Sequence, residues 1–187
     1  MQQACSFKPL PRIRLYRVPR GVPGTMETAR MISKLICEGA KDFAVRQRAI
    51  EIFRERGVPA KDRMGEVRAL FDWVRRNVRY TRDIYQVELL HTARRMLELQ
   101  AGDCDDMTIV LGAMLKATGH PVRLCLVGFR PQYVHAYSHI YPEVNLRGRW
   151  IPIDATMHYP MGWAPPAVWK RICEITKDGM ICSCEIE

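Results

Sequence analysis

The sequence lacks any long apolar run. No stretch approaches the ~18 apolar residues that cross a bilayer, so we expect no transmembrane helix. The first residues, MQQACSFKPLPRIRLYRVPRG, alternate basic residues with prolines and lack the apolar core of a secretory signal. These absences argue against a membrane-spanning or secreted protein and lead us to expect a cytoplasmic location.

Internal repeats, low-complexity tracts and recognised nucleic-acid-binding motifs are also missing. The net charge of +9 raises the question of nucleic acid, because clustered Lys and Arg neutralise phosphates. Here the arginines are scattered over predicted helices, as in RQRAIEIFRER, DWVRRNVRY and HTARRMLE. Nucleic acid is therefore disfavoured as a partner. Ordinary exposed helix faces explain the scattered charge best, and an acidic protein or surface is the alternative ahead of nucleic acid. The basic N-terminal arm is the segment that would contact partner proteins.

The metal-binding patterns are incomplete. The acidic segment GDCDD (residues 102–106) lacks the loop and the glycine of an EF-hand, so no calcium site is expected. Near the C-terminus, Cys173, Cys182 and Cys184 form C-x8-C-x-C without an evident fourth ligand. A metal, a disulfide and plain packing all remain open for these three cysteines. We predict no metal and no cofactor.

One domain with an appended arm suits a chain of 187 residues. Residues 1–24 contain four prolines and are expected to form an extended arm. We expect the main domain at 25–163, with a helical part at 25–118 and a sheet part at 120–157. Residues 164–187 are expected to form a C-terminal extension packed on that domain.

Hydrophobic periodicity and capping residues predict the individual elements. Helices are expected at 25–39 with Thr25 as cap, at 42–56, from Asp62 to about 78, at 91–99 and from Asp103 onward. Strands rich in β-branched and aromatic residues are expected at 121–129, 137–146 and 149–156. The tail should add a short helix around PAVWKRICEI and a last strand, MICSCEIE. Helices followed by antiparallel strands place the protein in the α+β class.

Cys104 lies where a helix should begin. With Asp103 as N-cap, Cys104 takes the first helical position, where free N–H groups and the helix dipole favour an anion. Helical spacing turns the cysteine toward the core and turns Asp105 and Asp106 toward solvent. The dipole supplies only about 0.3–2 kcal/mol, whereas lowering a thiol pKa from ~8.5 to ~4.5 needs about 5 kcal/mol. A cation, most simply a histidine, has to supply the rest. Two other cysteines, Cys37 and Cys125, fall on apolar faces and are assigned to the core.

His139 differs from the other histidines because it lies within a strand and has a carboxylate partner. That partner is Asp154, in WIPIDAT. If Arg147 and Gly148 form a two-residue hairpin turn, His139 and Asp154 project from one face as diagonal neighbours. A three-residue loop without a bulge would place them on opposite faces. The remaining histidines are assigned to surface or structural positions: His91, His120, His135 and His158.

Cysteine, histidine and aspartate in this arrangement point to thiol acyl transfer. Cys104 would attack a carboxamide carbon, His139 would hold the thiolate and protonate the leaving amine, and Asp154 would orient the imidazolium. The backbone N–H of Cys104 is a natural oxyanion donor, and Tyr80 and Asn77 are weak candidates for a second donor. The tryptophans that flank the catalytic strand and its exit are assigned to the core, with one lining a substrate groove as the alternative: Trp150, Trp163 and Trp169.

Three motifs in this order, AGDCDDMTIVLGAMLKATGHPVRL, SHIYPEV and WIPIDAT, resemble the transglutaminase-like superfamily of papain-like cysteine enzymes. The similar region covers roughly residues 65–163. The stretch VRYTRDIYQVELLHTARRMLELQAGDCDD is especially similar to versions met in bacteria and tailed bacteriophages. By this resemblance the fold is α+β and papain-like, and the catalytic positions are Cys104, His139 and Asp154.

The superfamily includes cross-linking transglutaminases, proteases, amidases and inactive members, so the resemblance implies the scaffold better than the substrate. We expect a thiol hydrolase acting on a protein or peptide amide, because the compact chain shows no extra domain that would admit an acceptor amine and exclude water. A protein-glutamine acyltransferase is the second hypothesis. The third is a structural component of a phage particle, in its head or tail, that keeps the fold with or without activity; such a chain would be virion-associated.

Overall fold

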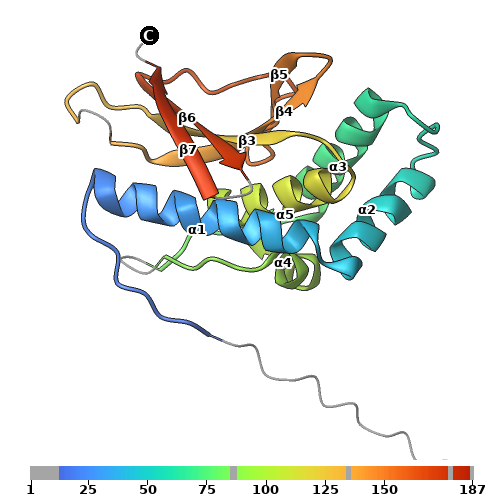
Figure 1. Ribbon diagram of the computed structural model, residues 1–187, viewed down its shortest axis with the longest axis horizontal. Helices are drawn as coiled ribbons and strands as arrows, with labels where there is room; N and C mark the ends of the chain where they lie inside the picture. The colour runs from blue at the N-terminus through green and yellow to red at the C-terminus, as the bar shows by residue number, and fades with distance from the viewer. Residues whose placement is uncertain (1–12, 85–87, 134–135, 177–178, 186–187) are drawn as a thin grey trace, which may run out of the picture.

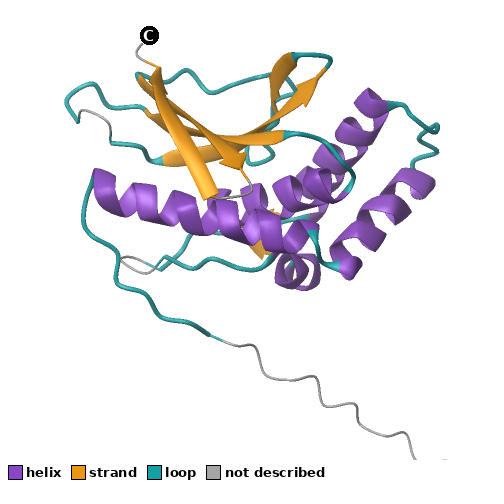
Figure 2. Ribbon diagram, in the orientation of Figure 1, coloured by secondary structure: helices purple, strands orange, loops and turns teal. Residues whose placement is uncertain are grey.

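The computed structural model describes residues 13–84, 88–133, 136–176 and 179–185. The predictions for residues 1–12 of the arm and for His135 therefore lie outside the described residues, as does any statement about the side chain of Cys184. In the described part the chain forms helices on one side and an antiparallel sheet on the other, as Figures 1 and 2 show. This confirms the predicted α+β class.

The helices lie close to the predicted ranges, and Asp62 and Asp103 are N-caps as predicted. They are α1 (Val22–Ala40), α2 (Phe43–Glu55), α3 (Arg63–Asn77), α4 (Ala93–Leu99) and α5 (Cys104–Ala117). The side chains of Asp42, Asp62 and Asp103 each accept a hydrogen bond from the backbone of the first turn that follows them. None of the helices within the described ranges combines the length and apolarity needed to cross a bilayer.

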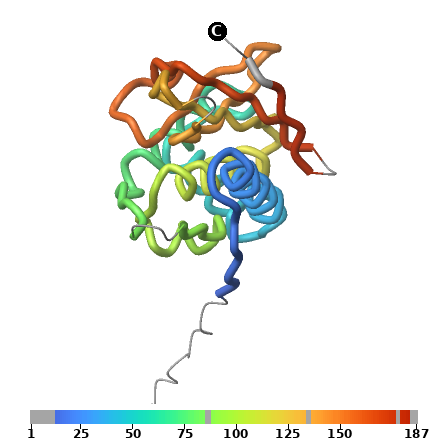
Figure 3. Tube along the Cα trace, turned by 90° about the vertical axis from the view of Figure 1, so that its left-hand side faces the viewer, coloured from blue at the N-terminus to red at the C-terminus, as the bar shows by residue number. Residues whose placement is uncertain are grey.

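The beginning of α1 corrects one prediction. The helix starts at Val22 with Gly21 as N-cap, so Thr25 lies inside the first turn and is not the cap. Pro23 occupies that first turn, where its missing N–H costs nothing because the helix would not use it. The described part of the N-terminal arm therefore ends at Gly21, and it leaves the N-terminal end of α1 and extends away from the helices (Figures 1 and 3).

The sheet has the strand order β5-β4-β3-β6-β7, and every neighbouring pair is antiparallel. Its strands are β3 (Val122–Gly128), β4 (His139–Leu146), β5 (Arg149–Pro152), β6 (Trp169–Thr176) and β7 (Gly179–Glu185). The helix predicted around PAVWKRICEI is wrong, because this segment is β6 and pairs with the central strand β3. Its β-branched and aromatic residues suit both states, and the open edge of β3 decides for a strand.

Helix α5 forms the centre of the molecule. It contacts the other four helices together with β3 and β4, and its residues 105–115 are all buried. At Gly39 of α1 an added Cβ would lie 2.8 Å from the Cβ atoms of Ala113 and Ala93, so glycine allows α1 to approach α5 and α4 closely. A helix that is buried over most of its length therefore carries Cys104 at its N-terminal end.

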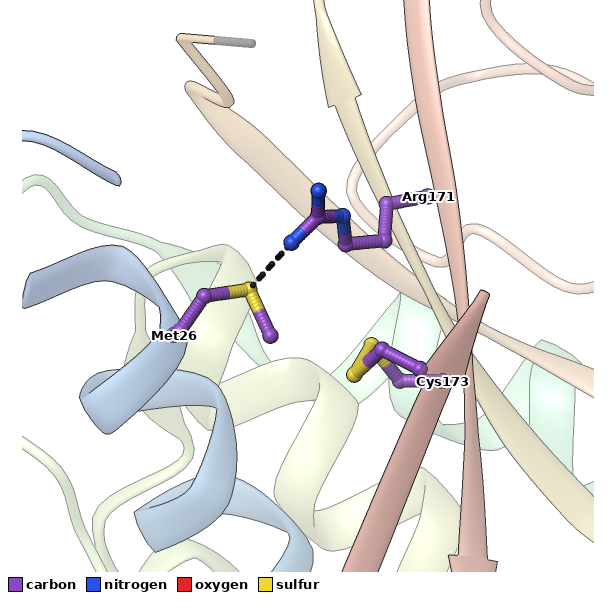
Figure 4. The surroundings of a disulfide bond; sticks show 4 residues. Met26, Arg171 and Cys173 are labelled. Atoms are coloured by element: carbon purple, nitrogen blue, oxygen red, sulfur yellow. Dashed lines mark hydrogen bonds between the residues drawn. A yellow bond between two sulfur atoms is a disulfide. The ribbon is translucent and has the colours of Figure 1, made fainter. Parts of the chain in front are cut away.

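A disulfide joins the last two strands. Cys173 of β6 and Cys182 of β7 are directly paired across the ladder and form the bond, with Cys173 fully buried. Of the alternatives left open for the C-terminal cysteines, the structure selects the disulfide for Cys173 and Cys182. On the same strand, Arg171 donates a hydrogen bond to the sulfur of Met26 on α1, 3.4 Å away (Figure 4). These contacts tie the C-terminal strands to the first helix.

Candidate active site

The position of Cys104 is fixed by a short ladder and a cap. The strand β2 (Ala101–Gly102) runs parallel to β1 (Arg79–Tyr80) and leads directly into α5. Asp103 then caps α5, and its side chain accepts hydrogen bonds from the backbone N–H groups of Asp105 and Asp106 at 3.0 and 3.3 Å. As predicted, Cys104 is the first helical residue, so its own N–H is not used by the helix.

The tip of α5 rests against an uncovered edge of β4. The strand β5 pairs only with residues 143–146 of β4, which leaves the backbone of Ile140 open on that side. Thr108 donates a hydrogen bond to the carbonyl oxygen of Ile140 at 3.3 Å. One turn earlier on the helix, the sulfur of Cys104 is hydrogen bonded to the backbone of Ile140. The sulfur therefore lies beside the residue that follows His139.

His139 and Asp154 form a hydrogen-bonded pair. The hairpin turn pairs Leu146 with Arg149, as predicted, and the Nε2 atom of His139 lies 2.7 Å from Oδ2 of Asp154. The strand β5 ends at Pro152, earlier than predicted, so Asp154 lies just beyond the ladder. Only 8% of the His139 side chain and 1% of the Asp154 side chain are exposed to solvent.

Thr156 holds the other oxygen of that carboxylate. Its backbone N–H and its hydroxyl donate to Oδ1 of Asp154 at 3.0 and 2.6 Å. The carboxylate is thus fixed from both sides, and Oδ2 is directed at the imidazole. Sequence reasoning missed this role of Thr156, although a threonine two residues after an aspartate is a common local hydrogen-bonding pattern.

Cys104 and His139 open into one cavity of about 400 Å³. Tyr80, Glu88, Asp103 and Asp105 also line it. Its opposite wall comes from the end of the N-terminal arm and the first turns of α1: Val18, Pro19, Gly21, Gly24, Thr25, Thr28, Ala29 and Ile32. No sequence signal pointed to the contribution of the arm or of Glu88.

The acidic residues after Cys104 are buried, which corrects the prediction that they face solvent. Asp105 is 8% exposed and Asp106 is 1% exposed. Asp106 accepts a hydrogen bond from the His91 backbone and contacts His91 Nδ1, both at 2.8 Å. Gly102 makes room for this side chain, because an added Cβ would lie 2.5 Å from Oδ2 of Asp106. Asp106 therefore anchors the segment that enters α4.

Asp105 remains beside the thiol, which donates a weak hydrogen bond to its Oδ1 at 3.4 Å. Burial raises the pKa of Asp105 well above its ordinary value, and the charges of Asp103 and Glu88 raise it further. Asp103 behaves in the same way, and burial raises its pKa to about 6. Both carboxyl groups are therefore easier to protonate than exposed aspartates.

The same environment disfavours the thiolate. Burial raises the pKa of Cys104 well above its ordinary value, and the charges of Asp105 and Asp103 add to the effect. The hydrogen bond from Ile140 lowers the pKa but does not offset them. Ionisation of Cys104 therefore needs an adjacent cation or proton acceptor.

The other candidates from the sequence lie elsewhere. Asn77 donates its side-chain amide to the carbonyl of Trp73 at 2.8 Å and does not line the cavity, whereas Tyr80 does. His120 is buried against Glu66 at 2.9 Å, and His158 is exposed. The three tryptophans considered for a substrate groove are absent from the described lining of the cavity.

The acidic groups close to the thiol are also the ones whose spacing is most similar to that of metal ligands. Within the described residues, ligand atoms of Asp83, Glu88 and Asp103 lie within 4.8 Å of one another, as do those of Asp103, Cys104 and Asp105. Clusters of this kind are common without an ion. We assign no metal to them.

Comparison with known families and structures identifies the fold. A family model described as the transglutaminase-like superfamily matches residues 50–155. A solved "putative protease" from Parabacteroides distasonis superposes with a TM-score of 0.58 at 12% identity, over 79% of this chain and 29% of that one. A "putative cysteine protease" from Cytophaga hutchinsonii shares 24% identity over 60% of this chain and 37% of that one, with a TM-score of 0.46.

The two solved structures match this chain over only part of their own length. The chain spans about a third of the length of these two solved structures. Curated proteins give no match to the sequence. The superposition on the Parabacteroides distasonis structure supports the fold, and the family model covers the segment from α2 to the residue after Asp154.

Proposed function

The chain belongs to the transglutaminase-like superfamily, and from this premise we propose that it is a cysteine hydrolase that cleaves an amide bond through a thioester acyl-enzyme. One observation carries the proposal: Cys104 at the tip of α5 opens into the same cavity as His139, whose ring is hydrogen bonded to Asp154. A nucleophile, a base and a group that orients the base are the parts that this chemistry requires. A protein or peptide is the proposed substrate.

His139 is the proposed proton acceptor. Because its Nε2 is bound to Asp154, Nδ1 is the ring nitrogen available to the thiol. The thiol proton passes to Nδ1 as the sulfur attacks the carbonyl carbon, and the carbonyl oxygen becomes an oxyanion. The imidazolium then gives this proton to the leaving amine, the C–N bond breaks, and a thioester on Cys104 remains.

Asp154 is the proposed orienting residue. Its carboxylate is held by Thr156 on one oxygen and faces the imidazole with the other, so it stabilises the positive ring formed during attack. Water then attacks the thioester, with His139 acting again as base, and releases the acid. This cycle returns every proton to its starting position.

The raised thiol pKa agrees with a mechanism in which the proton leaves during attack. A cysteine surrounded by Asp103 and Asp105 gains little from a standing negative charge, because the carboxylates oppose it. Transfer to His139 in the attack step avoids a free thiolate in the resting cavity. Reactivity should therefore depend on His139 as well as on Cys104.

Replacing the nucleophile tests the proposal. We expect a Cys104→Ala variant to lose all turnover and all labelling at this site by a chloroacetamide activity probe. Its free energy of unfolding should change by less than about 1 kcal/mol. Peptide mapping of the labelled protein identifies the modified cysteine. Cys37→Ala is the matched control, since Cys37 is a half-buried free cysteine outside the cavity.

Several results would redirect or overturn the assignment. Selective labelling of Cys104 that depends on His139 supports catalysis, whereas slow and uniform labelling of all free cysteines contradicts it and favours a retained scaffold, including a phage-particle component. Cleavage of glutamine-containing peptides without uptake of a primary amine supports hydrolysis. Incorporation of the amine would move the assignment to acyl transfer.

A further inference from the structure

The acyl-transfer mechanism needs two donors for the oxyanion, and only one is evident at the tip of α5. The backbone N–H of Cys104 is unused by the helix, and the cap residue Asp103 takes the N–H groups of Asp105 and Asp106 instead. The backbone of Ile140 is hydrogen bonded to the sulfur itself. A second donor therefore has to come from another wall of the cavity.

Tyr80 is a candidate for the second donor. It lines the cavity together with Cys104 and His139, and 46% of the residue is exposed. The lining also includes the carboxylates of Glu88, Asp103 and Asp105, which would repel an oxyanion unless they were protonated. Its other hydroxyl groups lie on α1 or on the segment that enters β4: Thr25, Thr28, Tyr137 and Ser138. Among these hydroxyl groups, that of Tyr80 belongs to the strand paired with the segment that leads into Cys104.

The backbone around Tyr80 is held in register with the nucleophile. Tyr80 pairs with Gly102 in the β1–β2 ladder, two residues before Cys104. Arg79 N–H donates to the carbonyl of Gln100 at 2.8 Å, and Thr81 N–H donates to the carbonyl of Gly102 at 2.9 Å. These bonds on either side of Tyr80 fix the strand to the segment that enters α5, so the two residues keep a constant relation.

The hydroxyl also keeps its proton. Burial raises the pKa of Tyr80, and negative charge on Cys104 and Asp103 raises it further. The phenol is therefore a donor at every pH at which the thiol chemistry would operate. Asn77, the other candidate from the sequence, is occupied by the carbonyl of Trp73.

We propose that the Tyr80 hydroxyl and the backbone N–H of Cys104 together donate hydrogen bonds to the oxyanion formed when the sulfur attacks the substrate carbonyl. Tyr80 is then a catalytic residue, and this role rests on the proposed function of Cys104. In the step itself the S–C bond forms, the carbonyl π electrons move to oxygen, and the thiol proton goes to His139. When the tetrahedral intermediate collapses, the leaving group departs and the two hydrogen bonds relax.

Two reagents separate this role from a general effect on the thiol. p-Nitrophenyl acetate acylates a cysteine through a tetrahedral oxyanion and releases p-nitrophenolate, whereas iodoacetamide alkylates it by direct displacement at carbon, with no oxyanion. We expect Tyr80→Phe to slow acylation of Cys104 by about 10- to 100-fold, within the range seen when one oxyanion donor is removed. Alkylation by iodoacetamide should change less than about twofold.

The controls keep each outcome interpretable. Tyr133→Phe removes a hydroxyl from an exposed tyrosine outside the cavity and should alter neither rate. Thermal unfolding of each variant checks that it folds. Tyr80→Phe removes only one oxygen atom from a half-exposed residue. Tyr80→Gln, which restores a donor, should recover part of the acylation rate if Tyr80→Phe has lost it.

Two results would overturn the role of Tyr80. Equal acylation rates for the wild-type protein and Tyr80→Phe would show that the hydroxyl does not contact the oxyanion. Parallel losses of acylation and alkylation would show that Tyr80 acts on the sulfur. Failure of the wild-type protein to form an acetyl thioester on Cys104, detected by mass spectrometry, would instead count against the proposed function itself.

Discussion

At Cys104 the environment opposes ionisation more than it favours it. The helix terminus and the hydrogen bond from Ile140 favour the thiolate, whereas burial and the charges of Asp105 and Asp103 oppose it. The balance raises the pKa of the thiol. Single changes in these carboxylates should therefore alter reactivity in a predictable direction.

Replacing Asp103 with asparagine tests this balance. Asn caps helices as well as Asp does, so Asp103→Asn keeps the cap of α5 and removes one charge next to the sulfur. We expect the thiol pKa to fall and the alkylation rate of Cys104 at pH 7 to rise about three- to tenfold. Asp62→Asn, the same change at the N-cap of α3, is the control and should leave the rate unchanged.

The same variant should change how stability depends on pH. The pKa of Asp103 is about 6 in the folded protein and about 3.9 when unfolded. Between these values the folded state binds more protons, so the contribution of Asp103 to stability falls as pH rises from about 4 to 6. Urea unfolding should show this decline in the wild-type protein and a smaller one in Asp103→Asn. Identical pH profiles would contradict the assigned pKa.

At the scale of elements, one tight turn sets the geometry of the site. Arg147 and Gly148 both have positive φ, at 53° and 83°, and this two-residue turn pairs Leu146 with Arg149. Side chains alternate along a strand, so the turn length fixes which residues of β4 and β5 face each other. The segment beyond β5 then carries Asp154 to the imidazole.

Gly148 is the position in this turn most sensitive to substitution. We expect Gly148→Ala to lower the free energy of unfolding by about 1 kcal/mol, because a Cβ disfavours the left-handed conformation. Asn tolerates that conformation, so Gly148→Asn should cost clearly less. Urea denaturation of both variants measures the difference, and equal losses would show that the left-handed conformation is not the cause.

At the scale of the whole molecule, the C-terminal strands connect the sheet to α1. The strand β6 pairs with the central strand β3, β7 pairs with β6, and α1 contacts β7. The disulfide joins residues nine positions apart in sequence and closes this hairpin. Met26 and Arg171 connect the same region to α1, whose first turns form a wall of the cavity.

Opening the disulfide should destabilise the fold without removing the site. We expect Cys182→Ser, or reduction with dithiothreitol, to lower the free energy of unfolding by about 2–3 kcal/mol, through the closure entropy of the small loop. Alkylation of Cys104 should persist under native conditions, because neither cysteine lines the cavity. Urea unfolding with and without reductant measures the effect. Equal stability in both would show that the bond is not formed in solution.

Much of the helical half follows from local patterns in the sequence. Asp42, Asp62 and Asp103 mark the starts of α2, α3 and α5. A carboxylate at the N-cap accepts hydrogen bonds from the free N–H groups of the first turn, whatever the helix packs against. The pairing register of β4 and β5 also follows from the two turn residues alone. These are effects of short range.

Only the tertiary structure decided the rest. The carboxylates of Asp105 and Asp106 are buried because the segments around Glu88 and His91 fold over the tip of α5, and helical spacing cannot report such contacts. The segment PAVWKRICEI became a strand because the edge of β3 was open to it, and Val18 and Pro19 reached the cavity through the path of the arm. The sequence by itself determined which residues could start a helix, turn a hairpin or carry a proton. Their burial, and hence the pKa values that govern the chemistry, depended on segments distant in the chain, because solvent is excluded only when those segments meet.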